Sequence, residues 1–344
     1  MKKIIYIIFF LFTAALGFAQ QEGHFTHFMY NQQTFNPGYV GSRGVPSITA
    51  LYRNQWLDIE GAPQNIAVSY DSPFLDDRVG FGLNIVNQGD GRFDTWNASM
   101  AYSYGIPVSE GLTIRIGLQG TAEYTQIDLS DPTILDPNGS DDPSIMTASL
   151  EPTQLKGNVG AGIYLHSERF YFGISSPRFL SNEIGFNENT DVVTAFRVAH
   201  YYAMAGFTVP MSEKVKLRPA FMGKYVQGAP FQLDANLSAI FSDKFTLGAS
   251  YRTGGSGTGE SVDFLLMLQL SKRMGLGVAY DFTLSDLKDY NNGTFELMLR
   301  YDFKLKRSDL ENGRDFSGNS KSKKSASSKK SNNDKSKSKS RKRR

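Results

Sequence analysis

The chain has no cysteine among its 344 residues. This excludes disulfides and any metal site built on thiolates. After the apolar run at residues 4–12, the sequence has no stretch of the about 20 apolar residues that a membrane-spanning helix needs. No nucleophile motif or acid–base pair stands out either. The sequence therefore predicts neither an enzyme nor a bound cofactor or metal.

The amino end is typical of an exported protein. Lys2 and Lys3 precede the apolar run, and small residues follow it up to Ala19. A basic start, a short apolar middle and small residues before the cut are the marks of a secretory signal peptide. We expect residues 1–19 to be removed, and because no cysteine follows Ala19, the signal is not that of a lipoprotein.

Charge is divided unevenly along the chain. Residues 305–344 carry 15 basic and 4 acidic side chains, a net +11, whereas residues 20–304 carry 20 basic and 30 acidic ones, a net −10. The carboxy-terminal segment has almost no apolar residues to bury, so we expect a disordered basic tail. Export makes nucleic acid an implausible partner for it, and anionic lipid or an acidic periplasmic protein fits its charge better.

Alternation of apolar and polar residues dominates from about residue 46 to 304. Near the end, apolar residues at 295, 297, 299, 301 and 303 interleave with Glu296, Arg300 and Asp302. A period of two predicts strands. A water-filled lumen tolerates charge on the inward face, and aromatic residues gathered at strand ends suit the two membrane interfaces. The pattern favours a membrane barrel over a soluble sandwich.

The sequence predicts fourteen strands, at 46–57, 62–72, 77–88, 92–105, 111–127, 154–166, 169–177, 192–209, 214–226, 230–241, 244–252, 260–271, 273–283 and 293–304. Every second connection is tight, and several of the others are long. Short periplasmic turns with long external loops are the usual asymmetry of an outer-membrane barrel. We therefore predict an all-β, transmembrane antiparallel β-barrel of about 14 strands, whose last strand ends in Phe303 as the signal for membrane insertion. Residues 20–45 lack this period and are expected to plug the lumen or to lie beneath it.

A series of short motifs begins inside that segment. Residues 26–42 read THFMYNQQTFNPGYVGS, with Asn31, Asn36, Pro37, Gly38 and Gly41 among them. The sequence YRNQW, which holds Arg53, Gln55 and Trp56, follows, and then come GAP at 61–63 and SYDSP at 69–73. The order resembles the PorP/SprF family of the type IX secretion system of Bacteroidetes, over about residues 20–304. The family usually has Asn-Pro-Ala-Tyr where this chain has glycine at position 38.

The resemblance implies a non-enzymatic protein of the outer membrane. Such proteins support the secretion or surface attachment of cargo proteins with type IX sorting domains, including gliding adhesins, and work with periplasmic parts of the machine. An alternative is a channel for small apolar solutes, because fatty-acid channels also use fourteen strands and an amino-terminal plug. A third possibility, an outer-membrane hydrolase, would need a catalytic pair at the outer face of the barrel.

Three clusters of polar residues were candidates for sites. His24 and His27 have ligand-like spacing but no third ligand nearby, and the acidic loop at 128–142 is rich in oxygen atoms without the spacing of a calcium loop. For both, ordinary polar residues are the better interpretation. Arg53 and Gln55 share one phase of the first predicted strand, and we expect them to anchor residues 20–45 from within the lumen.

Overall fold

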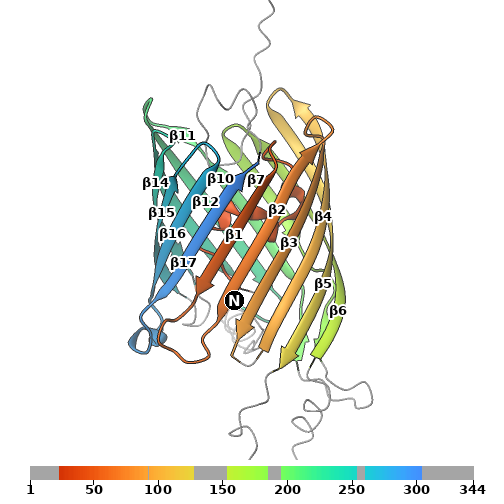
Figure 1. Ribbon diagram of the computed structural model, residues 1–344, viewed down its shortest axis with the longest axis vertical. Helices are drawn as coiled ribbons and strands as arrows, with labels where there is room; N and C mark the ends of the chain where they lie inside the picture. Colours follow the sequence, from red (N-terminus) through yellow and green to blue (C-terminus); the bar gives the residue numbers. More distant parts are fainter. Residues whose placement is uncertain (1–22, 92, 128–152, 185–194, 254–259, 304–344) are drawn as a thin grey trace, which may run out of the picture.

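The computed structural model describes residues 23–91, 93–127, 153–184, 195–253 and 260–303. Within these ranges fourteen long strands form one antiparallel sheet that closes into a barrel (Figure 1). Each long strand pairs with its neighbours in the chain, and the first strand also pairs with the last, Ser47 lying opposite Asp302. The prediction of a fourteen-stranded all-β barrel is confirmed.

The strands are β1 (Ser47–Asn54), β2 (Gln64–Phe74), β3 (Val79–Asp90), β4 (Phe93–Ser109), β5 (Leu112–Ile127), β6 (Thr153–Ser167), β7 (Phe170–Ser176), β10 (His200–Phe207), β12 (Val215–Val226), β13 (Gln232–Phe241), β14 (Phe245–Arg252), β15 (Ser261–Gln269), β16 (Met274–Thr283) and β17 (Thr294–Asp302). The two-residue β11 (Val209–Pro210) continues the line of β10 along β12. A short 3-10 helix, η6 (Asp286–Asp289), lies between β16 and β17.

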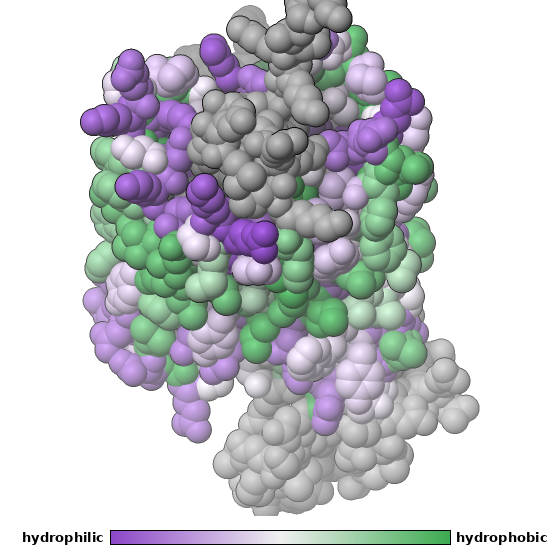
Figure 2. All heavy atoms as spheres, turned by 45° about the horizontal axis from the view of Figure 1, so that its top comes forward, coloured by the Kyte–Doolittle hydropathy of each residue, from purple (hydrophilic) through white to green (hydrophobic). Residues whose placement is uncertain are grey.

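The alternation in the sequence sets which side chains face inward. In β17, Glu296, Met298 and Arg300 are buried inside the barrel, whereas Leu297 and Leu299 are exposed on its outer wall. On the face that Figure 2 shows, apolar side chains gather in a band across the middle of the barrel and hydrophilic ones toward its ends. Exposed large apolar side chains occur on strands from β2 to β17. This band matches the lipid-facing belt of an outer-membrane barrel. No helix among the described residues is long and apolar enough to cross a membrane.

The two ends of the barrel differ in their connections. At the end where β1 begins and β17 stops, the connections have two to four residues. At the opposite end they reach 25 residues, between β5 and β6. By the usual asymmetry, the end with short turns is periplasmic and the end with long loops is external. The acidic loop 128–142 and the basic tail 305–344 lie outside the described residues, as do residues 1–19, for which a signal peptide is expected.

One predicted strand, 192–209, begins later than expected. The barrel strand starts only at His200, and Ala195–Arg197 (β9) pairs instead with Asn182–Ile184 (β8) in a separate two-stranded sheet. The alternation of apolar and polar residues in the sequence runs on from one sheet into the other. Period two identifies a strand but not the partner with which it pairs, and this explains the error.

The segment before β1 lies inside the barrel. It contains three 3-10 helices, η1 (Phe28–Tyr30), η2 (Gln32–Thr34) and η3 (Pro37–Tyr39), and nearly all residues from Phe25 to Val45 are buried. We call residues 23–45 the plug. In Figure 1 the plug is visible through the wall formed by β1, β2 and β3.

The plug runs the length of the lumen rather than resting at one end. Its last residues reach the periplasmic rim, where Arg43 pairs with Asp302 at 3.0 Å. Its first part lies toward the external end, because Thr26 bonds Glu296, the partner of Arg53 near the end of β1. Although β1 starts at the periplasmic end, the described chain therefore begins deep in the external half of the barrel.

Candidate functional site: the plugged lumen

The periplasmic half of the plug is pressed against glycines of the barrel wall. A Cβ added to Gly117 would lie 2.3 Å from the backbone nitrogen of Gly38, and one added to Gly162 would lie 2.1 Å from Oδ1 of Asn36. No side chain fits in so little space. Asn36 uses the closeness, since its Nδ2 donates to the carbonyl of Ile163 at 3.1 Å while its Oδ1 accepts from the amide of Gly38 at 2.8 Å.

The next two plug residues are held through their backbone atoms. The carbonyl of Val40 accepts from Oγ of Ser103 at 2.5 Å and from Nε of Arg115 at 2.9 Å. The amide of Gly41 donates to the carboxylate of Asp71 at 2.5 Å. Gly41 has φ +77°, a conformation that glycine adopts without strain. Backbone recognition of this kind fixes the path of the chain.

The external half of the plug is held by buried charge. Glu296 accepts hydrogen bonds from the backbone amides of Thr26 at 2.7 Å and His27 at 2.8 Å, and from Nδ1 of His27 at 2.7 Å. Arg53 bonds the same carboxylate at 3.2 Å and forms an ion pair with Asp281 at 2.6 Å. The side chains of Glu296, Arg53 and Asp281 are at most 3% exposed. Removing one member would leave a buried charge without its partner.

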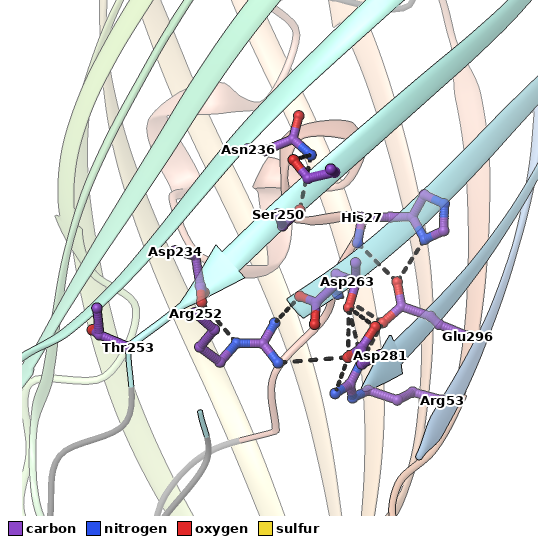
Figure 3. A network of polar contacts seen from close by, with 12 residues as sticks. His27, Arg53, Asp234, Asn236, Ser250, Arg252, Thr253, Asp263, Asp281 and Glu296 are labelled. Atoms are coloured by element: carbon purple, nitrogen blue, oxygen red, sulfur yellow. Dashed lines mark hydrogen bonds and ion pairs between the residues drawn. The ribbon is translucent and has the colours of Figure 1, made fainter. Parts of the chain in front are cut away.

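A second arginine extends this network across the next strands (Figure 3). Nε of Arg252 bonds Asp234 at 2.7 Å, and its terminal nitrogens lie 3.7 Å from Asp263 and 3.6 Å from Asp281. Asp281 thus lies between Arg252 and Arg53. The arrangement joins side chains of β1 and of the five strands β13, β14, β15, β16 and β17 in one charged cluster beside the start of the plug.

Aromatic and apolar side chains fill the space between the two halves. Tyr30 lies under the guanidinium of Arg218, 4.7 Å from the ring centre, and its hydroxyl accepts a hydrogen bond from that arginine. The ring of Phe35 contacts that of Tyr202 at 5.3 Å, and the carbonyl of Phe35 accepts from Oγ of Ser175 at 2.9 Å. The lumen is a packed interior here, with plug and wall sharing one apolar core.

Histidine 24 lies beside this charged cluster. Desolvation lowers the pKa of His24 well below its ordinary value, and the positive charges of Lys224, Arg252 and Arg53 lower it further. The ring is therefore neutral at pH 7. Among the described residues no group of three or more His, Asp or Glu side chains is placed to hold a metal ion.

The structure brings most of the sequence-predicted residues into the plug or its contacts. Asn31 is buried and bonds Thr34 at 3.0 Å, and Pro37 opens η3. Gln55 and Trp56 lie beyond the end of β1, and their described bonds are backbone ones, to the Pro63 carbonyl and to Oγ1 of Thr294. Arg53 contacts the plug directly, since its Nη1 donates to Oγ1 of Thr26 at 2.9 Å. Gln55 makes no described side-chain contact with the plug. Phe303 follows β17, half-exposed at the outer wall, with its ring 5.3 Å from that of Tyr301.

Several residues that hold the plug could not be singled out from the sequence. Glu296 was assigned correctly to the inward phase, but nothing in its neighbourhood indicates a partner some 270 residues earlier. Gly117 and Gly162 are ordinary glycines of an alternating strand by sequence. A strand glycine on the inward phase does, however, signal a close backbone approach, and that signal could have been used.

The plug leaves little free space. One small cavity of about 30 Å³ remains beside it, bordered by Phe25, Phe35 and polar side chains of β3 to β5. Such a volume suits about one water molecule. Within the part of the chain that the structure describes, plug and wall close the lumen.

Comparison with known sequences gives one family. The family model described as "Type IX secretion system membrane protein PorP/SprF" matches residues 17–301, most of the chain. No curated protein gives a significant match.

Comparison with solved structures returns barrels of the outer membrane. They include the CymD monoaromatic hydrocarbon channel (TM-score 0.49, 11% identity, covering 84% of this chain and 95% of that one). They also include Omp33 of Acinetobacter baumannii (0.42, 8%, 75% and 98%) and a FadL homologue of Pseudomonas aeruginosa (0.41, 12%, 78% and 93%). These likenesses are too distant to carry a functional argument.

Proposed function

Because the chain belongs to the PorP/SprF family of type IX secretion system membrane proteins, we propose that it supports the secretion or cell-surface attachment of cargo proteins such as gliding adhesins. In this role it catalyses no reaction. Its partners are outer-membrane lipid around the barrel, secreted proteins with type IX sorting domains at the external end, and periplasmic components of the machine at the other.

One observation carries the proposal: the lumen is filled by the chain's own plug. Residues 23–45 are held by hydrogen bonds and ion pairs to strands on several sides of the barrel, from β1, β2, β4, β5, β16 and β17. A conduit for a passing protein or solute needs open space, whereas nearly all plug residues from Phe25 to Val45 are buried and the cavity beside Phe25 and Phe35 has about 30 Å³. A closed barrel suits a docking platform for cargo.

Deleting residues 24–42 tests this role. The strands pair with one another independently of the plug, so we expect the truncated barrel to insert and to show the usual heat-dependent shift in gel mobility. Cells that carry it should lose cargo from their surface, measured by protease accessibility of the cargo on intact cells. Normal cargo display by an inserted, truncated barrel would remove the plug from the mechanism.

The alternative function, a channel for small apolar solutes, is tested with the same two proteins. In planar bilayers the full chain should give no stable conductance steps, and the truncated barrel should give large ones. In uptake assays with a small hydrocarbon, cells with the full chain should match cells without the protein. Uptake that depends on the full chain, with cargo display unchanged by its removal, would favour the channel.

The basic tail is proposed to meet the periplasmic side of the machine. The last described residue, Phe303, lies at the periplasmic rim next to the start of β1. Its backbone amide donates to the carbonyl of Pro46 at 3.0 Å. Residues 305–344 carry a net +11 and follow directly. A cationic segment tethered there favours binding to an acidic surface in a salt-dependent way.

A further inference from the structure

The outer wall of the barrel has a hollow over β6, β7, β10 and β12. It forms an open groove of about 580 Å³ with an almost entirely apolar lining. Its floor includes Ala161, Ala203 and Gly223, and Tyr201 and Tyr225 stand beside it. The groove lies on the outer face of the wall, outside the lumen.

The strand register explains why the wall is hollow there. At one level of the wall, the outward residues of four neighbouring strands are Ile163, Ile174, Ala203 and Gly223. The side chains are therefore large on β6 and β7 and small on β10 and β12. On the opposite wall, a comparable row stays large, from Leu247 through Leu266 and Val278 to Leu297. Small residues in one row of an otherwise bulky belt leave a depression, which the ring of Phe231 covers only at Gly223.

Large side chains surround the small ones on the external side. Tyr201 and Tyr225 lie in contact, with ring centres 6.3 Å apart. Phe231 follows β12 in the next connection, and a Cβ on Gly223 would come within 2.9 Å of its ring. Phe179, 44% exposed, borders the groove from the segment after β7. The result is a trough with small residues at its base and aromatic rings beside it.

The hydroxyls of the two serines in the lining are already used, and apart from the tyrosine hydroxyls the lining is almost entirely apolar. Oγ of Ser175 donates to the carbonyl of Phe35 in the plug at 2.9 Å, and Oγ of Ser176 donates to the carbonyl of Arg178 at 2.9 Å. A peptide or a sugar entering the groove would lose hydrogen bonds to water without gaining others. The occupant must therefore be apolar along its length.

We propose that this groove binds one acyl chain of a membrane lipid. The groove lies on the lipid-facing phase of the strands, continuous with the apolar belt, so hydrocarbon is the medium that meets it. A flexible chain can follow a trough that the flat wall of another barrel could not enter. The acyl chain also covers the part of the wall that contains β7, the shortest of the fourteen long strands with seven residues.

The test compares the wild-type barrel with two variants that add the same ring to an outward alanine. Ala203→Phe fills the base of the groove, whereas Ala98→Phe places the ring on the lipid-facing wall of β4, away from it. Each protein is reconstituted with a phospholipid that carries a photoreactive group in its acyl chain, and crosslinked peptides are mapped by mass spectrometry. Native mass spectrometry after purification from membranes counts the retained lipid molecules.

We expect wild type and Ala98→Phe to crosslink several-fold more on residues 161–179 and 201–231 than on the β14–β17 wall, and to retain one lipid. Ala203→Phe should lose both signals while keeping its heat-dependent gel shift, which reports a folded barrel. Uniform crosslinking around the belt, or crosslinking that Ala203→Phe leaves unchanged, would overturn the proposal. So would retention of a lipoprotein in place of a free lipid.

Discussion

The close approach of the plug to Gly117 can be tested with a single methyl group. In Gly117→Ala, the new Cβ would lie 2.3 Å from backbone atoms of Pro37 and Gly38, whereas ordinary contacts begin at 3.4 Å. Neither neighbour is a flexible side-chain end, so η3 must move by roughly 1 Å, the difference between these distances. The hydrogen bonds of Asn36 and Val40 to the wall, at 2.5 to 3.1 Å, cannot all survive such a shift.

The expected loss is large for one methyl group. Overpacking costs about 1–3 kcal/mol, and the loss of one wall hydrogen bond adds about 0.5–1.5 kcal/mol. Docking of the plug should therefore weaken by about 2–4 kcal/mol, or roughly 30-fold to several hundred-fold at 1.4 kcal/mol for each factor of ten. The strand pairs of β5 remain, so the barrel itself should stay folded.

The absence of cysteine makes the assay clean, because one introduced thiol is the only reactive one. Ser42→Cys places it at a buried plug position next to the affected contacts. The rate of maleimide labelling should rise by the same factor in Gly117→Ala. Gly120→Ala is the control on the same strand: a Cβ there meets nothing within 4 Å, and labelling should not change. Equal labelling in both variants would refute the close-packed contact as the source of plug stability.

Three further predictions address the network, the membrane belt and the tail. Glu296→Gln removes the negative charge that Arg53 faces and weakens the bonds to the plug amides. Breaking a buried pair costs about 3–5 kcal/mol, so a thiol introduced by Met29→Cys should label at least about a hundredfold faster. An unchanged rate would contradict the anchoring role. Leu299→Arg should destabilise the folded barrel by about 2–4 kcal/mol in a lipid folding assay. Met211→Arg, in an exposed periplasmic turn, should cost about 0–1 kcal/mol. Equal costs would mean that Leu299 does not face the membrane interior. Removing residues 305–344 should leave an inserted barrel that still displays cargo. This barrel should no longer co-purify with periplasmic components at low salt. Co-purification that is unchanged and insensitive to salt would refute the role of the tail as a tether.

Local sequence was enough to predict the strands. Alternation over β16 and β17 indicated both their extent and their inward phase, because each outward position meets lipid and each inward one meets the lumen. The same rule failed at Ala195–Arg197, which pair in a small separate sheet instead of the barrel. A segment with the sequence period of a strand can pair with more than one partner. Its own sequence does not determine which partner it pairs with.

The plug could be recognised by its motifs and its lack of period, but its path could not be predicted. Asn36, Gly38 and Gly41 act through backbone atoms and close approach, which leave no pattern in the surrounding residues. Arg53 was singled out as an anchor from its phase and because its motif and that of the plug occur together in the family that the sequence resembles. Its partners, Asp281 and Glu296, belong to the far end of the chain, and only closure of the barrel brings them beside it.

That closure also sets an order for assembly. Thr26 bonds Asp281 and Glu296 across 255 and 270 residues, so the external half of the plug has no binding site until β16 and β17 have joined β1. Most of the periplasmic half instead meets β2, β4, β5 and β6, which precede those strands in the chain, and only Arg43 at its end waits for Asp302 of β17 among the contacts described. Contacts of long sequence separation form late because loop closure is costly before they are made. The charged cluster around Arg53 is therefore fixed late, when β16 and β17 close the barrel, as is the pair of Arg43 with Asp302.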